Sequence, residues 1–160
     1  MIKQLRIDDR LFHGEIVALW ISTLGVDSVV VADDVYASNQ MNIMTAQLSK
    51  PKFLKLNILT MEKAIAYLQD PAHAREKILV TCANAQNALA LCKAVEGIPE
   101  VNAACMRFSE GKVQVGLKAF VDQKDLDDLQ EIENMGKSVI SHTVPANPRS
   151  TLADMIKKAK

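Results

Sequence analysis

Short apolar runs alternate with stretches of helical spacing along almost the whole chain, and this alternation constrains the fold most. Short runs rich in aliphatic and β-branched residues are typical of strands buried in a parallel sheet, and they cover residues 2–7, 28–32, 55–59, 78–82, 101–106 and 137–144. Between them, apolar residues recur at helical spacing, and four capping residues stand where helices would begin: Asn39, Thr60, Asn84 and Asp122. The pattern predicts an α/β fold with a mainly parallel central sheet and helices on both faces.

Residues 101–117 interrupt the simple alternation. An apolar run at 101–106 is followed by Phe108, then Glu110-Gly111, then a second run at 113–117. Two such runs separated by a glycine-containing turn predict one antiparallel β-hairpin. The 160 residues, 49% of them hydrophobic, are enough for one sizeable core and short for two. With no repeat or linker along the chain, we predict a single domain covering residues 1–160.

Two helices carry predictions about which side chains face inward. After Asn39, the side chains of Met41, Met44 and Leu48 are expected to fill core space rather than form a binding surface. After Asp122, the helix should bury its leucine and isoleucine side chains. Its acidic side chains should face water: Asp125, Asp127, Asp128, Glu131 and Glu133.

Charge and cysteine content exclude several classes of function. Lys plus Arg and Asp plus Glu both total 19, so the chain has no net charge, which argues against nucleic acid or an anionic membrane surface as the main partner. The three cysteines include no C-x-x-C pair, so we predict neither a disulfide framework nor a zinc site. The N-terminus lacks the apolar region of a signal peptide, and no run reaches the ~20 apolar residues of a membrane span. A reduced cytosol suits this composition.

The segment from Arg6 to Glu15 places two carboxylates, two guanidiniums and an imidazole between the first strand and the first helix. Ligands bind at this edge of parallel sheets, and amides at a helix start favour an anion. Histidine, with a usual pKa near ~6.5, is a nucleophile at cellular pH. We predict that Asp8 or Asp9 holds one nitrogen of the His13 ring while the other meets a phosphoryl group.

Three further residues fit a phosphate at this turn. Arg10 can present a planar set of donors to phosphoryl oxygens. Gly14, having no side chain, lets the main chain approach the same oxygens. Asp33, at the end of the second strand, lies at the same sheet edge and is expected to orient the His13 ring or hold Arg10. The alternative is that the aspartates only cap helices or strand ends and that His13 is an ordinary surface residue.

The segment RIDDRLFHG, residues 6–14, closely resembles the R-I-D-D-R-L-[apolar]-H-G signature of the IIB subunits of the mannose/sorbose class of the bacterial sugar phosphotransferase system. Phe12 is the apolar residue of this signature. The resemblance continues over essentially the whole chain, in Val29 to Asp34, in Val101-Asn102 with Met106 and Gly111-Lys112, and in Gly136 with Val144-Pro145.

The resemblance implies a cytoplasmic phosphocarrier, peripheral to the inner membrane through its partners. It implies that His13 accepts a phosphoryl group from a IIA subunit and passes it to a sugar held by the membrane subunits IIC and IID. Arg10 and Asp8 would assist, with Asp9, Phe12, Gly14 and Asp33 supporting the phosphate. No metal and no cofactor beyond the transient phosphohistidine is expected, and a homodimer is compatible with the sequence.

The chain departs from the family pattern at three places. Glu15 replaces the usual Gln, Ala104-Cys105 replaces Gly-Gly, and Ala83-Asn84 replaces Asn-Pro. These changes surround the nucleophile, so they leave open a family member that keeps the fold but only binds or regulates. The aspartates themselves leave a second alternative open, a magnesium-dependent phospho-aspartate protein of the receiver type that would use Asp8, Asp9, Asp33 and Asp34.

Overall fold

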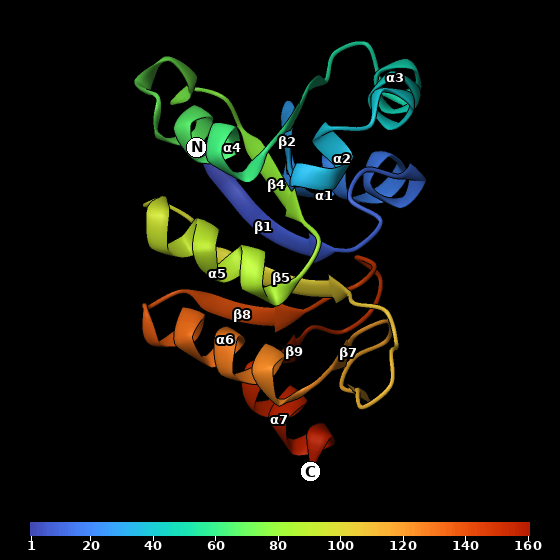
Figure 1. Cartoon of the computed structure of the whole chain (residues 1–160), viewed down its shortest axis with the longest axis vertical. Helices are drawn as coiled ribbons and strands as arrows, with labels where there is room; N and C mark the ends of the chain where they lie inside the picture. Colours follow the sequence, from blue (N-terminus) through green and yellow to red (C-terminus); the bar gives the residue numbers. More distant parts are fainter.

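A computed structural model describes residues 1–160 and has a seven-stranded sheet at its centre (Figure 1). The strand order is β3-β2-β4-β1-β5-β8-β9. Every strand is parallel to its neighbours except β9, which pairs antiparallel with β8 at one edge. The strands are β1 (Ile2–Asp8), β2 (Ser28–Ala32), β3 (Lys55–Leu59), β4 (Ile78–Cys82), β5 (Glu100–Cys105), β8 (Ser138–Ser141) and β9 (Ser150–Thr151). The predicted α/β class with a mainly parallel sheet is confirmed.

Helices follow most strands and begin where the capping residues predict. The side chains of Asn39, Thr60, Asn84 and Asp122 each accept a hydrogen bond from a backbone amide in the first turn. The α-helices are α1 (Ile21–Leu24), α2 (Asp34–Ala37), α3 (Gln40–Ser49), α4 (Met61–Gln69), α5 (Ala85–Ala94), α6 (Gln123–Asn134) and α7 (Leu152–Ala159). A π-helical turn, η1 (Ile16–Trp20), precedes α1, and a 3₁₀ turn, η2 (Pro71–His73), follows α4. None of these helices combines the length and apolar character needed to cross a membrane.

Each face of the sheet has its own hydrophobic core. Helices α4, α5 and α6 lie in a row across one face (Figure 1), where they pack with α7 on Leu5, Ile7, Val80 and their neighbours. On the other face, Ile16 and Ile21 from η1 and α1 join Ala46 of α3 against β2, β3 and β4. The helices therefore cover both faces and leave the carboxyl ends of the strands accessible.

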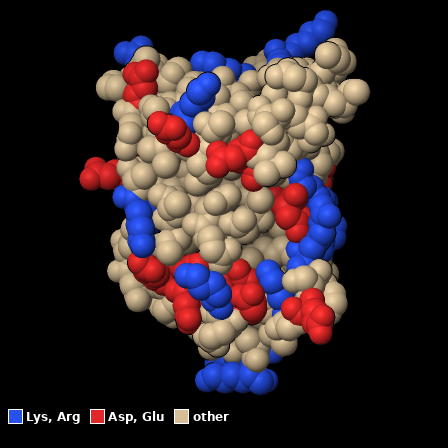
Figure 2. Space-filling model, viewed as in Figure 1, with Lys and Arg blue, Asp and Glu red and all other residues tan.

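Basic and acidic side chains are interspersed over the face that carries α4, α5 and α6 (Figure 2). Neither sign forms a large continuous area in this view, in keeping with the zero net charge of the chain. Recognition on this face therefore depends on local groups of side chains rather than on a broad field.

The hairpin prediction was right in type and wrong in pairing. The run 101–106 supplies β5, a buried parallel strand between β1 and β8. The antiparallel hairpin lies later, between β6 (Val113–Gln114) and β7 (Phe120–Val121). Gly111, with a φ of 88°, closes a turn from Ser109 to Lys112 that joins no two paired strands. The two-residue strands are too short to show a strand periodicity of their own.

The inward and outward predictions for α3 and α6 were also partly wrong. Met41, Met44 and Leu48 of α3 are 72%, 60% and 82% exposed, so they are not core. In α6, Asp125 and Asp128 are buried, because Gln86 of α5 donates to both carboxylates. Lys112 and Lys124 complete the charge pairing of these two aspartates, at 3.0 and 2.8 Å.

Candidate functional site

The chain turns sharply between the carboxyl end of β1 and η1. Leu11 has a φ of 60° and donates its amide hydrogen to the Asp8 carbonyl over 2.9 Å. A left-handed conformation costs a non-glycine residue about 1–3 kcal/mol and persists only where packing enforces it. The side chains of Leu11 and Phe12 supply that packing, because both are buried in the core beneath η1. The turn therefore holds His13 at the rim of the sheet.

Asp8 is the centre of the polar contacts at this turn, and its side chain is fully buried. Its Oδ2 accepts hydrogen bonds from Arg6 Nε and Arg10 Nη2 over 3.1 Å each, and its Oδ1 accepts from the amide and Nε of Arg10. Burial alone would raise the pKa of Asp8. The hydrogen bonds from His13 and Arg10, with the charges of His13 and Arg6, outweigh burial and hold that pKa well below its usual range. Asp8 is therefore ionised.

The His13 ring is fixed at both nitrogens. Nε2 lies 2.8 Å from Asp8 Oδ2, and the Glu15 amide donates to Nδ1 over 3.3 Å. Since Asp8 is an ionised acceptor, Nε2 carries the ring hydrogen, and Nδ1 presents its lone pair at the start of the helical segment. The side chain is 16% exposed. The structure thus selects Asp8, not Asp9, as the carboxylate that orients the ring.

Arg10 and Glu15 form an ion pair beside the ring. Arg10 Nη2 lies 2.7 Å from Glu15 Oε2, and the guanidinium is 30% exposed. Arg6 and Lys118 approach the same glutamate at 3.5 and 3.8 Å. Burial raises the pKa of Glu15, but the hydrogen bond and charge of Arg10 outweigh that effect and lower it. Glu15 is therefore a charged group that occupies the Arg10 guanidinium.

Three consecutive main-chain amides of the turn are unpaired. The N–H groups of Phe12, His13 and Gly14 donate to no protein acceptor. A Cβ built on Gly14 would meet nothing within 4 Å, so the space beside this residue is open. Unpaired amides at a helix start attract an anion. Phe12 thus contributes its main chain, while its side chain packs in the core.

Asp9 and Asp33 take other roles than the ones predicted. Asp9 accepts from the Arg107 amide over 2.7 Å and pairs with the Arg107 guanidinium at 3.2 Å. It thereby ties the turn after β1 to the loop after β5. Asp33 caps α2 by accepting from the Tyr36 amide over 2.9 Å, and it contacts neither His13 nor Arg10. The prediction that Asp33 orients the ring or holds Arg10 was wrong, because β4 separates β2 from β1.

The four aspartates of the magnesium alternative do not converge. Asp34 accepts from the Met61 amide and Asp33 caps α2, so neither reaches Asp8. Two smaller sets have ligand atoms within 4.8 Å of one another, Asp8 with Asp9 and Cys105, and Asp8 with His13 and Glu15. In both sets Asp8 already accepts from two guanidiniums. The Asp8 carboxylate shared by both sets is therefore already paired with arginine, and a site with two guanidiniums suits an anion better than a cation.

Cys105, one of the departures from the family pattern, lies beside the two aspartates of the turn. Its Sγ is 3.7 Å from Asp9 Oδ1 and within 4.8 Å of an Asp8 carboxylate oxygen. Burial together with the charges of Asp8 and Asp9 raises the thiol pKa, so the thiol is protonated. The carbonyl of Ala104 accepts from the Thr143 hydroxyl, so this pair of residues packs against the turn.

Sequence reasoning missed Arg6 as a member of the site. Its side chain is fully buried, its Nη2 donates to the Thr143 carbonyl over 3.3 Å, and its guanidinium lies 5.1 Å from the Trp20 ring. Nη1 has no partner. An arginine within an otherwise buried strand is itself a signal, since a buried charge needs a specific partner, and that partner is Asp8.

Comparisons of sequence and fold with known proteins identify the relatives of this chain. A family model described as "PTS system sorbose subfamily IIB component" matches residues 2–160. The N-acetylgalactosamine-specific phosphotransferase enzyme IIB component 1 of Escherichia coli K12 is 33% identical, over 93% of this chain and 94% of the relative. The mannose-specific EIIAB component of the same strain is 28% identical, over 96% of this chain and 47% of the relative. The IIBSor domain of the sorbose permease from Klebsiella pneumoniae has the same fold, with a TM-score of 0.92 at 22% identity over 100% of this chain and 98% of that one.

Proposed function

The chain belongs to the sorbose subfamily of IIB components of the phosphotransferase system, and we propose that it carries the transferred phosphoryl group on Nδ1 of His13. The resemblance carried by residues 6–14 is thereby confirmed. IIB components are phosphotransferases of sugar uptake. The observation that supports His13 most is the 2.8 Å contact between its Nε2 and the buried Asp8 carboxylate. This contact leaves Nδ1 without a hydrogen, so Nδ1 is the nucleophile once the Glu15 amide, which donates to it over 3.3 Å, releases its lone pair.

The first transfer is a direct displacement at phosphorus. Nδ1 of His13 attacks the phosphoryl group of a phosphohistidine on the IIA partner. The new N–P bond forms as the donor's N–P bond breaks, and the donor nitrogen keeps the electron pair. The Nε2 hydrogen stays on the His13 ring, so the ring gains positive charge while it holds the phosphoryl group. The ionised Asp8 offsets that charge, which is why its low pKa matters to the reaction.

Arg10 and the turn amides would hold the phosphoryl oxygens. The guanidinium is within 3.1 Å of Asp8 and partly exposed, so it is both anchored and reachable. Phe12, His13 and Gly14 supply three more donors, since their main-chain N–H groups are unpaired. Fixed donors and positive charge stabilise a transferring phosphoryl group without a metal ion. To bind the phosphoryl oxygens, Arg10 has to exchange Glu15 for them, since Glu15 holds its Nη2 at 2.7 Å.

We propose a IIA subunit as donor and a sugar held by membrane subunits IIC and IID as acceptor. The relative named mannose-specific EIIAB component supports the first partner, because its name joins A and B components and this chain aligns with 47% of it. In the second transfer the sugar hydroxyl oxygen bonds to phosphorus as the N–P bond breaks, Nδ1 keeps the electron pair of that bond, and the hydroxyl proton passes to water. The chain would work on the cytoplasmic side of the membrane, held there by its partners.

Homodimer formation stays a prediction, which light scattering of the purified chain would measure.

The test is phosphorylation by a phosphorylated IIA component. Wild-type protein should take up one phosphoryl group in a bond that survives alkali and is lost in acid. His13→Ala should take up none, whereas His142→Ala should label like wild type, because the His142 ring packs edge-on against Trp20 and its Nε2 lies 3.3 Å from the Pro145 carbonyl. A hydroxylamine-sensitive label would indicate an aspartyl phosphate instead. Labelling of His13→Ala, or no labelling of the wild type, would refute the proposal.

A further inference from the structure

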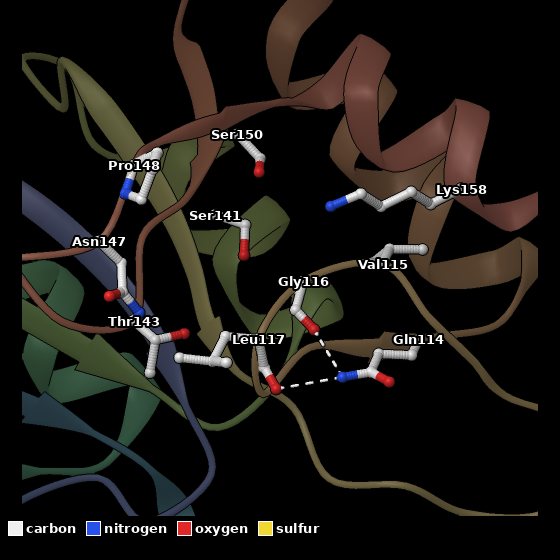
Figure 3. Close-up of a pocket in the computed structure, with 10 residues that line it drawn as sticks. All are labelled: Gln114, Val115, Gly116, Leu117, Ser141, Thr143, Asn147, Pro148, Ser150 and Lys158. Carbon is white, nitrogen blue, oxygen red and sulfur yellow. Dashed lines mark hydrogen bonds between the residues drawn. The ribbon is translucent and has the colours of Figure 1, made fainter.

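A cavity of about 540 Å³ opens beside the end of β8, at the same edge of the sheet as the histidine site (Figure 3). One wall is the turn of the β6–β7 hairpin at residues 114–117, and the opposite wall is the segment 147–150 that leads into β9. Ser141 and Thr143 lie between the two walls. The side chain of Lys158, from α7, reaches over the cavity with its ammonium group directed inward (Figure 3).

The cavity offers both donors and acceptors that the protein itself does not use. The Asn147 amide, the Ser150 hydroxyl and the Lys158 ammonium make no side-chain hydrogen bond or ion pair within the protein. The hydroxyls of Ser141 and Thr143 donate to the carbonyls of Ala103 and Ala104, so each presents acceptor lone pairs. A mixed set of donors and acceptors matches a ligand that carries several hydroxyl groups.

The walls of the cavity are already in place. The Gln114 amide folds back and donates to the carbonyls of Gly116 and Leu117 over 3.1 and 3.2 Å (Figure 3). Gly116 packs so closely on β8 that a Cβ there would lie 2.4 Å from Ser141 Oγ. A preformed cavity loses little conformational entropy when a ligand binds. Leu117 and Pro148 add apolar surface on which the carbon face of a ring can rest, with the buried Val115 beneath them.

Charge narrows the ligand class. Lys158 is the only charged side chain among the residues that line the cavity, so a ligand with one anionic group gains an ion pair, and a cationic ligand is repelled. The geometry points to a second small-molecule site that binds an anionic monosaccharide, either a sugar phosphate or a sugar acid. This site is distinct from the phosphoryl-transfer site, because none of its lining residues hydrogen-bonds to His13, Asp8 or Arg10, although the Thr143 carbonyl accepts from Arg6 and so links the two.

A two-dimensional NMR titration of the full ¹⁵N-labelled chain tests the site without any phosphoryl transfer. The ligands are glucose 6-phosphate, gluconate, glucose and inorganic phosphate. Glucose 6-phosphate or gluconate should shift the amide signals of residues 114–117 and 147–150 with a millimolar or tighter Kd, and the one that binds identifies the anionic group. Glucose and inorganic phosphate should each bind at least about tenfold more weakly, since glucose lacks the anionic group and inorganic phosphate lacks the sugar hydroxyls.

Matched variants separate the cavity from general surface charge. Lys158→Met should weaken binding of the anionic sugar about tenfold. Lys157→Met, one residue away on the same helix and outside the cavity, should bind like wild type. His13→Ala should also bind like wild type, so the result does not depend on the proposed phosphoryl transfer. Equal weakening by the two lysine variants, inorganic phosphate that binds as tightly as the sugar phosphate, or no shifts at the cavity with any ligand would overturn the proposal.

Discussion

Replacement of Asp8 by asparagine tests whether one carboxylate organises the site. The variant keeps the shape of the side chain but turns one carboxylate oxygen into an N–H₂ donor. In the wild type, Oδ2 of Asp8 accepts hydrogen bonds from Arg6, Arg10 and His13, and Oδ1 accepts from the amide and Nε of Arg10. In either orientation of the asparagine amide, therefore, an N–H₂ group faces a guanidinium donor.

The expected loss of stability follows from the burial of Arg6. Its fully buried guanidinium loses the carboxylate at 3.1 Å and keeps one carboxylate, Glu15 at 3.5 Å, besides the neutral Thr143 carbonyl at 3.3 Å. Breaking a buried ion pair by removing one partner costs about 3–5 kcal/mol. Because Glu15 remains, we expect a value near the lower limit, about 3 kcal/mol, which lowers the Tm by roughly 6–12 °C for a chain of this length.

Phosphorylation should fall as well, for a separate reason. Without an ionised acceptor at Nε2, the hydrogen of the His13 ring is no longer kept off Nδ1, and the positive charge of the phosphorylated ring is not offset. Loss of a positioned proton-holding group slows a reaction by about 10²- to 10⁴-fold. The assays are thermal unfolding by circular dichroism and single-turnover phosphorylation from a phosphorylated IIA component, below the Tm of both proteins.

Asp127→Asn is the matched control, since this aspartate is exposed on α6 and should change stability by less than about 0.5 kcal/mol. The reasoning would be refuted if Asp8→Asn unfolded within about 2 °C of wild type and was phosphorylated at the wild-type rate.

The other contacts of the structure lead to three further predictions. Glu15→Gln should shift the phosphoryl equilibrium with the IIA partner toward this chain by roughly fivefold, about 1 kcal/mol, because Arg10 is released from a 2.7 Å ion pair. Gel separation of the two phosphoproteins measures this equilibrium, and a shift toward the partner would contradict the prediction. Asp33→Ala should lose about 1 kcal/mol of stability in urea unfolding through loss of the α2 cap and should leave phosphorylation unchanged, and Asp33→Asn should retain the cap. Burial raises the pKa of Glu76, but hydrogen bonds from Lys55, Tyr67 and His73 outweigh it and lower the pKa from 4.5 to about 2. The stability that Glu76 contributes is therefore present above pH 4.5 and is lost as the pH falls toward 2. The free energy of unfolding of Glu76→Gln should therefore fall less steeply over this pH range than that of wild type. An equal dependence on pH in the two proteins would exclude a contribution from Glu76.

Most of the sheet could be predicted because its signals are local. Short, mainly apolar runs predicted β2, β3 and β4 with their observed bounds, and the capping side chains of Asn39, Thr60, Asn84 and Asp122 marked the starts of α3, α4, α5 and α6. The short antiparallel pairs could not be predicted, since two residues contain no periodicity. The strand β9 and the hairpin partner β7 owe their positions to contacts with residues distant in the sequence.

Side-chain burial was the harder part of the prediction. An aspartate on a helix is usually exposed, and Asp125 and Asp128 are buried only because Gln86 of a neighbouring helix donates to both. Met41 and Met44 have helical spacing but lie on an α3 face that no other element covers. In each case the outcome depends on tertiary neighbours that a single helix does not reveal.

The site divides in the same way between local and distant contacts. Asp8, Arg10 and His13 lie within six residues, so their meeting at one turn followed from the sequence. The choice of Asp8 over Asp9 did not, because it depends on Arg107 drawing Asp9 toward the loop after β5. The hold of Glu15 on Arg10 likewise required the geometry of the turn.

The central claim is that Asp8 holds Nε2 of His13 and thereby leaves Nδ1 to carry the phosphoryl group. The most direct measurement is ¹⁵N and ³¹P NMR of the phosphorylated chain with ¹⁵N-labelled histidine, which identifies the ring nitrogen bonded to phosphorus. We expect the phosphorus coupling at Nδ1 of His13, with the hydrogen retained on Nε2. A phosphorus bond at Nε2, the nitrogen that lies 2.8 Å from Asp8 Oδ2 in the structure, would contradict the account.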